Sequence, residues 1–283
     1  RRVIASPSMG RTVLVSAART PFCRLGGDLA GASAVDLGVA AATAAVERAG
    51  IAATDIDYAY IGTVVQAGQM HAMARQVTTR IGVPVERGSE TINKVCASGL
   101  RAVALADYMI RLDEAGVVLA GGMESMTSAP FLALGARQGY RFGDVQLADA
   151  NLHDGLRDPW THRVMYDQAN EVSVGLGITR DALDEWALRS HLRAVEAQRA
   201  GHFAPELTPV VIRERKGERV VEQDQGPRED STLEALGKLP ALTEGGTHTA
   251  GNSPGVTDGA AMLVAMSEEQ AAARGATPLA YVL

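Results

Sequence analysis

Short apolar runs alternate with longer amphipathic segments in the first part of the chain. Strands are predicted for the runs 12–16, 58–65, 90–95 and 117–120. Helices are predicted between them, over 34–49, 72–81 and 100–112. Strands separated by helices of this length favour right-handed crossovers and a sheet covered by helices, so the pattern predicts an α/β fold.

Polar residues and glycines mark the ends of these helices. Ser33 can cap the helix 34–49, with Asp36 at the third helical position and Gly50 as the stop. The helix 100–112 carries only three charged side chains, which predicts that much of its surface is buried.

The alternation is lost from about residue 128. The segment 128–246 is richer in charge and in Gly, Asp and Pro than the part before it. One long amphipathic helix is predicted within it, over 180–200, capped by Thr179 and stopped by Gly201. We therefore expect this segment to form an inserted or lid domain.

Apolar runs return after this segment. A run is found at 260–266, and it is followed by a predicted helix over 267–275 and a predicted strand over 279–283. A chain that stops on a strand leaves that strand without cover, which indicates further sequence downstream.

Composition and charge limit the classes of function. The chain has 283 residues, of which 46% are hydrophobic, and a formal net charge of −6. This acidic balance disfavours a dedicated surface for nucleic acid or for an anionic membrane, so neither is expected as a partner. No run approaches the roughly 18 apolar residues that a membrane-spanning helix needs.

The chain has two cysteines, Cys23 and Cys96, which lie far apart and form no CxxC pair. Neither a disulfide framework nor a metal site is indicated, and a cytoplasmic location in a reducing compartment fits this pattern best. Cys23, beside Phe22, is interpreted only as a core or surface thiol.

Cys96 lies where the predicted strand 90–95 turns through Ala97, Ser98 and Gly99 into the helix 100–112. The first N–H groups of a helix have no partner within it and the helix dipole is positive there, so both favour thiolate over thiol. The same N–H groups can hold an oxyanion when the sulfur attacks a carbonyl. The competing interpretation is a small buried hydrophobe, which is the commonest role of a free cysteine.

Four motifs occur in the order in which one enzyme family has them. They are SAARTP at 16–21, NKVCASGL at 93–100, AGGMESMTSAP at 120–130 and TAGNSPGVTDGAA at 249–261. Over almost its whole length the sequence therefore resembles a thiolase, that is, an acetyl-CoA acetyltransferase or a 3-ketoacyl-CoA thiolase. These motifs favour the nucleophile over the buried hydrophobe for Cys96.

The resemblance implies a thiolase-like fold of two similar α/β halves, each with a central mixed sheet covered by helices. A loop domain inserted in the first half would hold coenzyme A. Residues 1–127 with 247–276 correspond to the first half, 128–246 to the loop domain, and 277–283 to the opening of the second half.

The resemblance also implies a mechanism in which Cys96 takes the acyl group as a thioester, which CoA or a second acyl-CoA then resolves. Either thiolysis or Claisen condensation follows from this scheme, with the backbone N–H of Cys96 helping to stabilise the oxyanion. Contacts to CoA are implied at Arg228, Ala250, Ser253 and Met165. Acyl-CoA and CoA would be substrates, no cofactor would be tightly bound, and the protein would be a homodimer or homotetramer in fatty acid metabolism.

Several departures from the family pattern are visible. The family's other chemical groups are an Asn in an NEAF segment, a His in a GHP segment and a second Cys in a CxGxG segment, and this sequence contains none of these segments. The resemblance therefore implies that this chain alone is inactive or slow. Only Met165 matches the family's HMG-like segment, and Pro254 stands where many relatives have a Ser that touches CoA.

Other polar clusters carry weaker indications. None of the six histidines is expected to replace the catalytic base, which the resemblance assigns to the His of the GHP segment. His191 is interpreted as a surface residue, and His248 begins the turn that matches the CoA loop. Gly121 and Gly122 indicate a tight turn that passes close to the cysteine loop. The basic run 213–219 reads as a solvated turn.

Two alternatives stay open. A ketoacyl synthase also uses a Cys at a helix start, but its substrate is carried on an acyl carrier protein, and the segment 249–261 favours free CoA. The second alternative is a catalytically incomplete module that binds CoA or serves in assembly, because the second half of the family pattern is missing.

Overall fold

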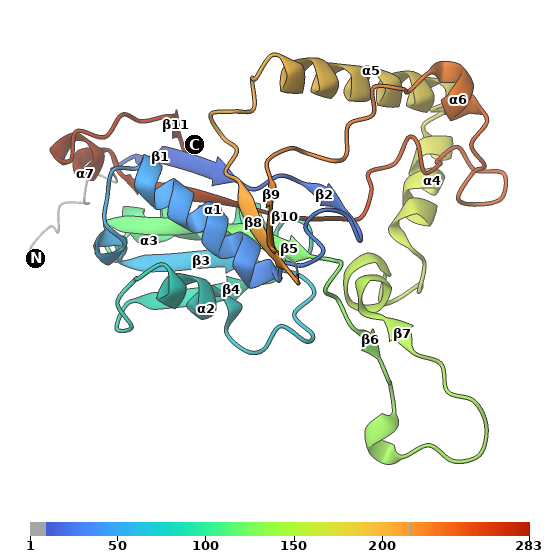
Figure 1. Ribbon diagram of the computed structural model, residues 1–283, viewed down its shortest axis with the longest axis horizontal. Helices are drawn as coiled ribbons and strands as arrows, with labels where there is room; N and C mark the ends of the chain where they lie inside the picture. The colour runs from blue at the N-terminus through green and yellow to red at the C-terminus, as the bar shows by residue number, and fades with distance from the viewer. Residues whose placement is uncertain (1–9, 216) are drawn as a thin grey trace, which may run out of the picture.

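The computed structural model describes residues 10–283 except residue 216. One sheet lies at its centre, in the order β11-β1-β10-β5-β3-β4, and β2 pairs beside β10 (Figure 1). These strands are β1 (Thr12–Arg19), β2 (Cys23–Arg24), β3 (Tyr58–Gly62), β4 (Gly88–Ile92), β5 (Val117–Ser125), β10 (Thr257–Ser267) and β11 (Ala280–Tyr281).

The sheet is mixed, as expected from the thiolase resemblance. Strand β3 runs parallel to β4 and to β5, whereas β10 runs antiparallel to β5, β1 and β2. The register of β3 and β5 places Gly62, the last residue of β3, beside Gly122. The C-terminal ends of these two parallel strands therefore lie at the same end of the sheet. That end is where the candidate nucleophile lies.

Helices cover both faces of the sheet. Helices α1 (Ala34–Arg48) and α2 (Met73–Arg80) share a core with Val117 and Leu119 of β5, and α1 crosses in front of the sheet in Figure 1. Helix α3 (Ser98–Arg111) shares a separate core on the other face with Val118 and Ala120. Successive residues of β5 therefore serve opposite faces, because side chains alternate along a strand.

The predicted helix ends are confirmed where a side chain supplies the cap. The Ser33 hydroxyl accepts from the N–H of Asp36 at 3.1 Å, and the Asp36 carboxylate accepts from the N–H of Ser33 at 2.9 Å, which completes a capping box. Gly50, just past the end of α1, has a φ of +67°, which a glycine adopts without strain.

Several predicted boundaries are wrong. The strand predicted over 90–95 is β4, which ends at Ile92, and β1 continues past residue 16 to Arg19. Strand β3 ends at Gly62, not at residue 65, because residues 63–65 leave the sheet to donate to a carboxylate described below. Strand β5 continues to Ser125, so Gly121 and Gly122 lie inside a strand and not in a tight turn, paired with Met262 and Ala261 of β10. Helix α3 begins at Ser98, two residues before the predicted start.

The burial expected for α3 is only partly confirmed. Ala102, Ala106 and Ile110 are buried against the sheet. Leu100 and Leu112, on the other side, are 75% and 70% exposed. The scarcity of charge on this helix therefore does not mean that it is buried all round within this chain.

Much of the segment 128–246 reaches away from the sheet, with α5 and α6 at one end and β6 and β7 at the other (Figure 1). Strands β8 and β9 instead lie over the sheet, where Val210, Ile212 and Val221 join the core that contains α1. Helix α5, confirmed with its Thr179 cap, is accompanied by a helix that the sequence did not predict, α4. The elements here are β6 (Phe131–Leu132), β7 (Ala148–Asp149), α4 (Met165–Gly175), α5 (Arg180–Arg199), β8 (Val210–Glu214), β9 (Gly217–Val221) and α6 (Leu233–Gly237).

Short elements complete the description. Strands β8 and β9 form a hairpin, and the basic run 213–219 lies at its turn, although Lys216 is outside the described residues. The others are the 3-10 helices η1 (Ala53–Asp55) and η2 (Ala136–Gln138), the π-helical turn η3 (Asn151–Leu156) and helix α7 (Glu268–Ala273), which Ser267 caps. None of the described helices is long and apolar enough to cross a membrane.

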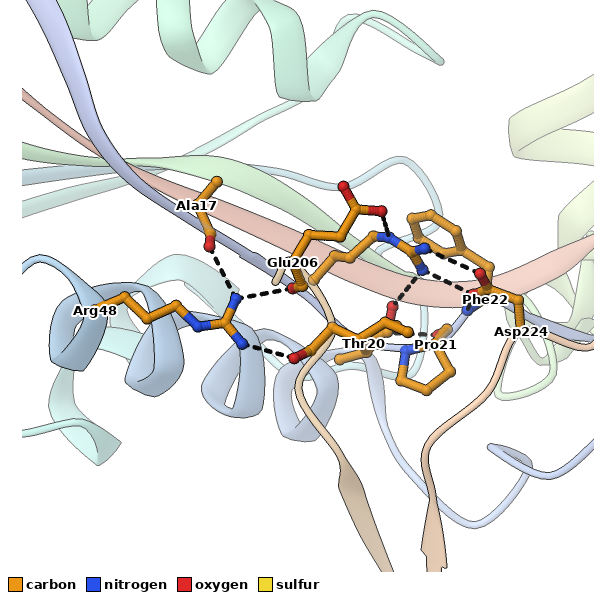
Figure 2. Close-up of polar contacts among 9 residues, drawn as sticks. Ala17, Thr20, Pro21, Phe22, Arg48, Glu206 and Asp224 are labelled. Atoms are coloured by element: carbon orange, nitrogen blue, oxygen red, sulfur yellow. Dashed lines mark hydrogen bonds and ion pairs between the residues drawn. The ribbon is translucent and has the colours of Figure 1, made fainter. Parts of the chain in front are cut away.

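Arg19, the last residue of β1, ties the segment 128–246 to the sheet through Glu206 and Asp224, which are labelled in Figure 2. Its guanidinium donates to both carboxylate oxygens of Asp224, at 2.7 and 2.9 Å, and its Nε donates to Glu206 at 2.7 Å. Asp224 also accepts from the N–H of Phe22 at 2.7 Å. The Arg19 and Asp224 side chains are only 12% and 11% exposed, so the Asp224 carboxylate depends on Arg19 for a charged partner.

Replacing Asp224 with asparagine is expected to destabilise the protein by about 2 kcal/mol, because the amide cannot accept both Arg19 donors and the N–H of Phe22. The loss would be measured as a lower urea midpoint at unchanged slope. Arg213→Gln is the control: this arginine meets Glu218 only at 3.6 Å and is 90% exposed, so its loss is expected to cost less than about 0.5 kcal/mol. Equal midpoint shifts for the two variants would contradict the role assigned to Arg19 and Asp224.

Candidate active site

Cys96 lies on the turn between β4 and α3, directly before Ala97, the N-cap of α3. Its side chain is exposed, and it lines a pocket of about 580 Å³ whose other walls come mainly from the ends of β3 and β5 and from β10. Cys23, by contrast, is fully buried in the core. The structure therefore places Cys23 in the core, one of the two positions that the sequence allowed, and leaves Cys96 exposed.

The turn that carries Cys96 is strained at the preceding residue. Val95 has a φ of +50°, a left-handed conformation that β-branched residues adopt very rarely and that costs on the order of 1–3 kcal/mol. Its N–H donates to Oδ1 of Asn93 at 3.0 Å, and its carbonyl accepts from the Ser98 hydroxyl at 2.5 Å. The Ser98 hydroxyl also accepts from the N–H of Lys94 at 2.8 Å, so two side chains hold the strained turn.

The start of α3 lies directly on the ends of β3 and β5. A Cβ on Gly62 would be 2.6 Å from the carbonyl carbon of Ser98 and 2.8 Å from the nitrogen of Gly99, closer than real Cβ contacts. A Cβ on Gly122 would be 3.5 Å from Cα of Gly99. The expected close approach to the cysteine loop is confirmed for Gly122, whereas Gly121 is crowded by β10.

Glu124, near the end of β5, is a carboxylate in the wall of the Cys96 pocket. It accepts from the N–H of Val64 at 2.7 Å, the N–H of Val65 at 3.2 Å and the hydroxyl of Thr63 at 3.2 Å. Burial raises the pKa of Glu124 above its ordinary value, against the opposing effect of these hydrogen bonds. Sequence reasoning assigned no role to this residue.

A second pocket of about 660 Å³ adjoins the first, since Thr257 lines both. Three of the four residues expected to contact CoA line it together, namely Arg228, Ala250 and Ser253. The Ser253 hydroxyl is buried and has no hydrogen-bond partner among the described residues, so its bonding capacity is unused.

The fourth residue, Met165, is not brought to this group. It begins α4, is 48% exposed and is not among the residues that line either pocket. The prediction for Met165 rested on one matching position of the family's HMG-like segment, and one position does not fix the location of a side chain.

Arg228 has a carboxylate partner in the second pocket. Its Nε and Nη2 donate to Asp230 at 3.2 and 3.1 Å, and this exposed pair raises the pKa of Arg228 and lowers that of Asp230. The backbone N–H of Arg228 donates to Nδ1 of His191 at 3.3 Å. His191, predicted as a surface residue of α5, thus lines this pocket, which the helical pattern alone did not reveal.

His248 lies on the loop that precedes β10. Its Nε2 is 3.0 Å from the hydroxyl of Ser173 in α4, so it links that helix to the turn carrying Ala250 and Ser253. Among residues 10–215 and 217–283, no group of three or more His, Cys, Asp or Glu side chains is arranged to hold a metal ion.

A comparison with protein families covers the part of the chain that forms both pockets. The model described as "Thiolase, N-terminal domain" matches residues 12–269, which include Cys96 and both pockets. The chain belongs to the thiolase family.

Curated relatives of this thiolase cover nearly all of it. The acetyl-CoA acetyltransferase of Escherichia coli (strain K12) is 45% identical over 276 residues, which are 97% of this chain and 70% of the relative. That of Paracoccus denitrificans is 43% identical over 275 residues, again 97% of this chain and 70% of the relative.

Solved structures agree with the observed fold. The Bacillus anthracis acetyl-CoA acetyltransferase superposes with a TM-score of 0.95 at 36% identity, over 98% of this thiolase and 70% of that chain. The structure from Syntrophomonas wolfei gives 0.93 at 39% identity, over 97% of this chain and 69% of that one. The thiolase-like mixed sheet expected from the sequence is therefore confirmed.

Alkylation of the folded thiolase by iodoacetamide at pH 8 is expected to label Cys96 at least about 100-fold faster than Cys23. Cys23 is buried, and burial, with smaller effects of Asp28, Asp224 and Asp258, raises its pKa to about 11. Peptide mapping after timed alkylation measures the ratio of the two labelling rates, and equal labelling without denaturant would contradict the assignment.

Because the folded-state pKa of Cys23 lies above its unfolded-state value, Cys23 stabilises the fold at low pH, and that contribution is lost as the pH rises toward 11.

Proposed function

We propose that this thiolase transfers acyl groups between coenzyme A thioesters through a thioester on Cys96. The observation that carries the proposal is the position of Cys96, exposed on a strained turn at the start of α3 and in a pocket that adjoins a second one. An acyltransferase of the thiolase type is supported by the family match, and acetyl-CoA as the substrate by the names of the relatives.

The first step uses the sulfur of Cys96 as the nucleophile. The thiolate of Cys96 attacks the carbonyl carbon of acyl-CoA, a carbon–sulfur bond forms and the oxygen takes the negative charge. The backbone N–H of Cys96 would stabilise this oxyanion, whereas those of Ala97 and Ser98 already donate to the carbonyls of Lys94 and Val95. Collapse breaks the bond to CoA, which leaves as a thiolate, and the acyl group stays on Cys96.

The second step returns the acyl group to a CoA derivative. In thiolysis the thiolate of CoA attacks the Cys96 thioester, and the first step runs in reverse. In condensation the attacking atom is the α-carbon of a second acyl-CoA, from which a proton must be removed. The family segments that supply the base are absent from this sequence, so no residue of this chain is assigned to that proton.

The second pocket fits the phosphate-bearing part of CoA. Arg228 presents paired donors, which suit a phosphate, and the unused hydroxyl of Ser253 lies in the same pocket. Asp230 occupies the Arg228 donors here, so a bound phosphate would replace that carboxylate. Ala250 adds an uncharged wall beside them.

A module that binds CoA without transferring acyl groups is the second candidate, supported by the second pocket that contains Arg228 and Ser253. The two candidates differ in one measurable reaction, the exchange of labelled CoA into unlabelled acetyl-CoA without any second acyl-CoA. Transfer through Cys96 predicts that the label enters acetyl-CoA. Binding of CoA without exchange would favour the module, and exchange with an acyl carrier protein in place of CoA would favour a ketoacyl synthase.

The proposed assembly and domain division extend beyond the family match. Exposed apolar side chains on the segment between β6 and β7 support a homodimer or homotetramer, among them Leu134 and Phe142. Pairing of β10 with β1 and β5 supports assigning 247–276 to the same domain as 1–127, with 128–246 inserted; β11, within 277–283, pairs with β1. A cytoplasmic location is proposed because both thiols are free.

A further inference from the structure

We infer that Glu124 is a positioning residue for Cys96, acting through the loop 63–65 and through Asn93. This inference rests on the proposed function, because it concerns how the nucleophile of that function is held. Glu124 need not touch the substrate for this role. A continuous series of hydrogen bonds leads from its carboxylate to the residue next to Cys96.

The first part of the series holds the loop after β3. This strand ends at Gly62, and the next three residues all donate to the Glu124 carboxylate, through the hydroxyl of Thr63 and the N–H groups of Val64 and Val65. One oxygen accepts from Val64 and the other from Thr63 and Val65, so both oxygens are used. A loop with three donors directed at one carboxylate has little freedom to move away from β5.

The second part runs from this loop to the cysteine turn. The carbonyl of Val64 accepts from Nδ2 of Asn93 at 3.2 Å, and Oδ1 of Asn93 accepts from the N–H of Val95 at 3.0 Å. The Asn93 amide therefore uses its donor toward the loop and its acceptor toward the turn. Moving the loop would move the amide that holds Val95.

Val95 is the residue whose conformation decides where Cys96 points. Its left-handed φ of +50° is unfavourable for a β-branched side chain and persists only because the surroundings hold it. Reversing this angle would redirect the chain at the next residue, which is Cys96. Because a displacement of about 1 Å can slow a reaction about 100-fold, the hydrogen bonds that hold Val95 should affect reactivity more than stability.

The Ser98 hydroxyl holds the same turn from the other side, accepting from Lys94 and donating to Val95. Breaking the Glu124 series should therefore slow Cys96 without abolishing its reaction. Glu124→Gln is nearly isosteric, but its amide nitrogen cannot accept, so donors of the loop lose their partner.

The test measures alkylation of Cys96 by iodoacetamide in Glu124→Gln, Asn93→Ala and the double variant. Each single variant is expected to slow alkylation about 10-fold, and the double variant by about the same factor, because both break one series. Glu234→Gln is the matched control; this glutamate lies on α6 and pairs only with exposed Lys238, so wild-type alkylation is expected.

The urea midpoint and the kinetics of Cys96 acylation distinguish a positioning role of Glu124 from a merely structural one. Unfolding lowers the fraction of active protein and the urea midpoint, whereas a positioning role lowers the rate of Cys96 acylation at saturating acetyl-CoA and leaves the half-saturating concentration unchanged. Wild-type alkylation in Glu124→Gln would overturn the inference, and so would an approximately 100-fold loss in the double variant, which would mean independent effects. If Glu124→Gln does not fold, Asn93→Ala carries the test alone, since Asn93 is exposed.

The acyl transfer by Cys96 and the positioning role of Glu124 can be tested independently. Alkylation by iodoacetamide needs the thiol of Cys96 but no acyl transfer. If the wild-type protein is alkylated normally but takes no acetyl group, the proposed function is wrong while the positioning series can still be tested. If it takes the acetyl group and Glu124→Gln does so equally fast, only the inference about Glu124 is wrong.

Discussion

Cys96→Ala is expected to lower the exchange of CoA with acetyl-CoA by a factor of at least about 10⁴, which in practice means to the background rate. The acyl group would lose the atom that carries it, and no neighbouring thiol can substitute. Cys23, the other cysteine of the chain, is fully buried with its pKa raised to about 11. The measurement is the initial rate of label transfer at equal concentrations of folded protein.

Cys23→Ala is the matched control for this variant. It removes the other thiol of the chain from a packed core and is expected to lower stability by about 1 kcal/mol, with exchange within about twofold of wild type. A Cys96→Ala protein that still exchanges CoA at a substantial fraction of the wild-type rate would contradict the assignment of the nucleophile.

Gly62→Ala is expected to have the second largest effect, a loss of Cys96 alkylation and acylation of about 100-fold, with a destabilisation of about 2 kcal/mol. The added Cβ would lie 2.6 and 2.8 Å from backbone atoms of Ser98 and Gly99, and backbone cannot swing aside as a flexible side chain can. The start of α3 would therefore be pushed off the ends of β3 and β5, and Cys96 would move with it.

Gly175→Ala is the control, because a Cβ at this last position of α4 would meet nothing within 4 Å. Alkylation of Cys96 is expected at the wild-type rate and stability is expected to change by less than about 1 kcal/mol. If Gly62→Ala is alkylated as fast as Gly175→Ala, the close packing of α3 on the strands does not position the thiol.

Local features of the fold could be predicted because their causes lie close together in the sequence. The Ser33 capping box uses residues three apart, and the Thr179 and Ser267 caps likewise act on N–H groups three residues on. The apolar runs of β1, β5 and β10 could be predicted for the same reason, because the hydrophobic pattern that marks each strand lies within its own residues. The resemblance to thiolases predicted that the sheet is mixed.

The ends of elements near the site could not be predicted, because long-range contacts decide them. Residues 63–65 have the apolar character of a strand, yet Glu124 withdraws them from the sheet across about 60 positions. Gly121 and Gly122 favour a turn by composition, but pairing with β10 keeps them extended.

Candidate site residues could be predicted where a motif contains them and could not where only the folded geometry brings them to a pocket. Cys96, Arg228, Ala250 and Ser253 lie in family-like segments, and the structure brings the last three into one pocket. His191 and Glu124 reach the pockets through contacts with partners 37 and about 60 residues away, which no local pattern records. Arg19 meets Asp224 across 205 positions in the same way.

The most direct test of the central claim is the intact mass of the folded protein after incubation with acetyl-CoA alone, followed by peptide mapping. Transfer through a Cys96 thioester predicts a single acetyl adduct, mapped to the peptide that contains Cys96 and removed by free CoA. A folded protein that binds acetyl-CoA but gains no adduct, or gains it on another residue, would contradict the claim.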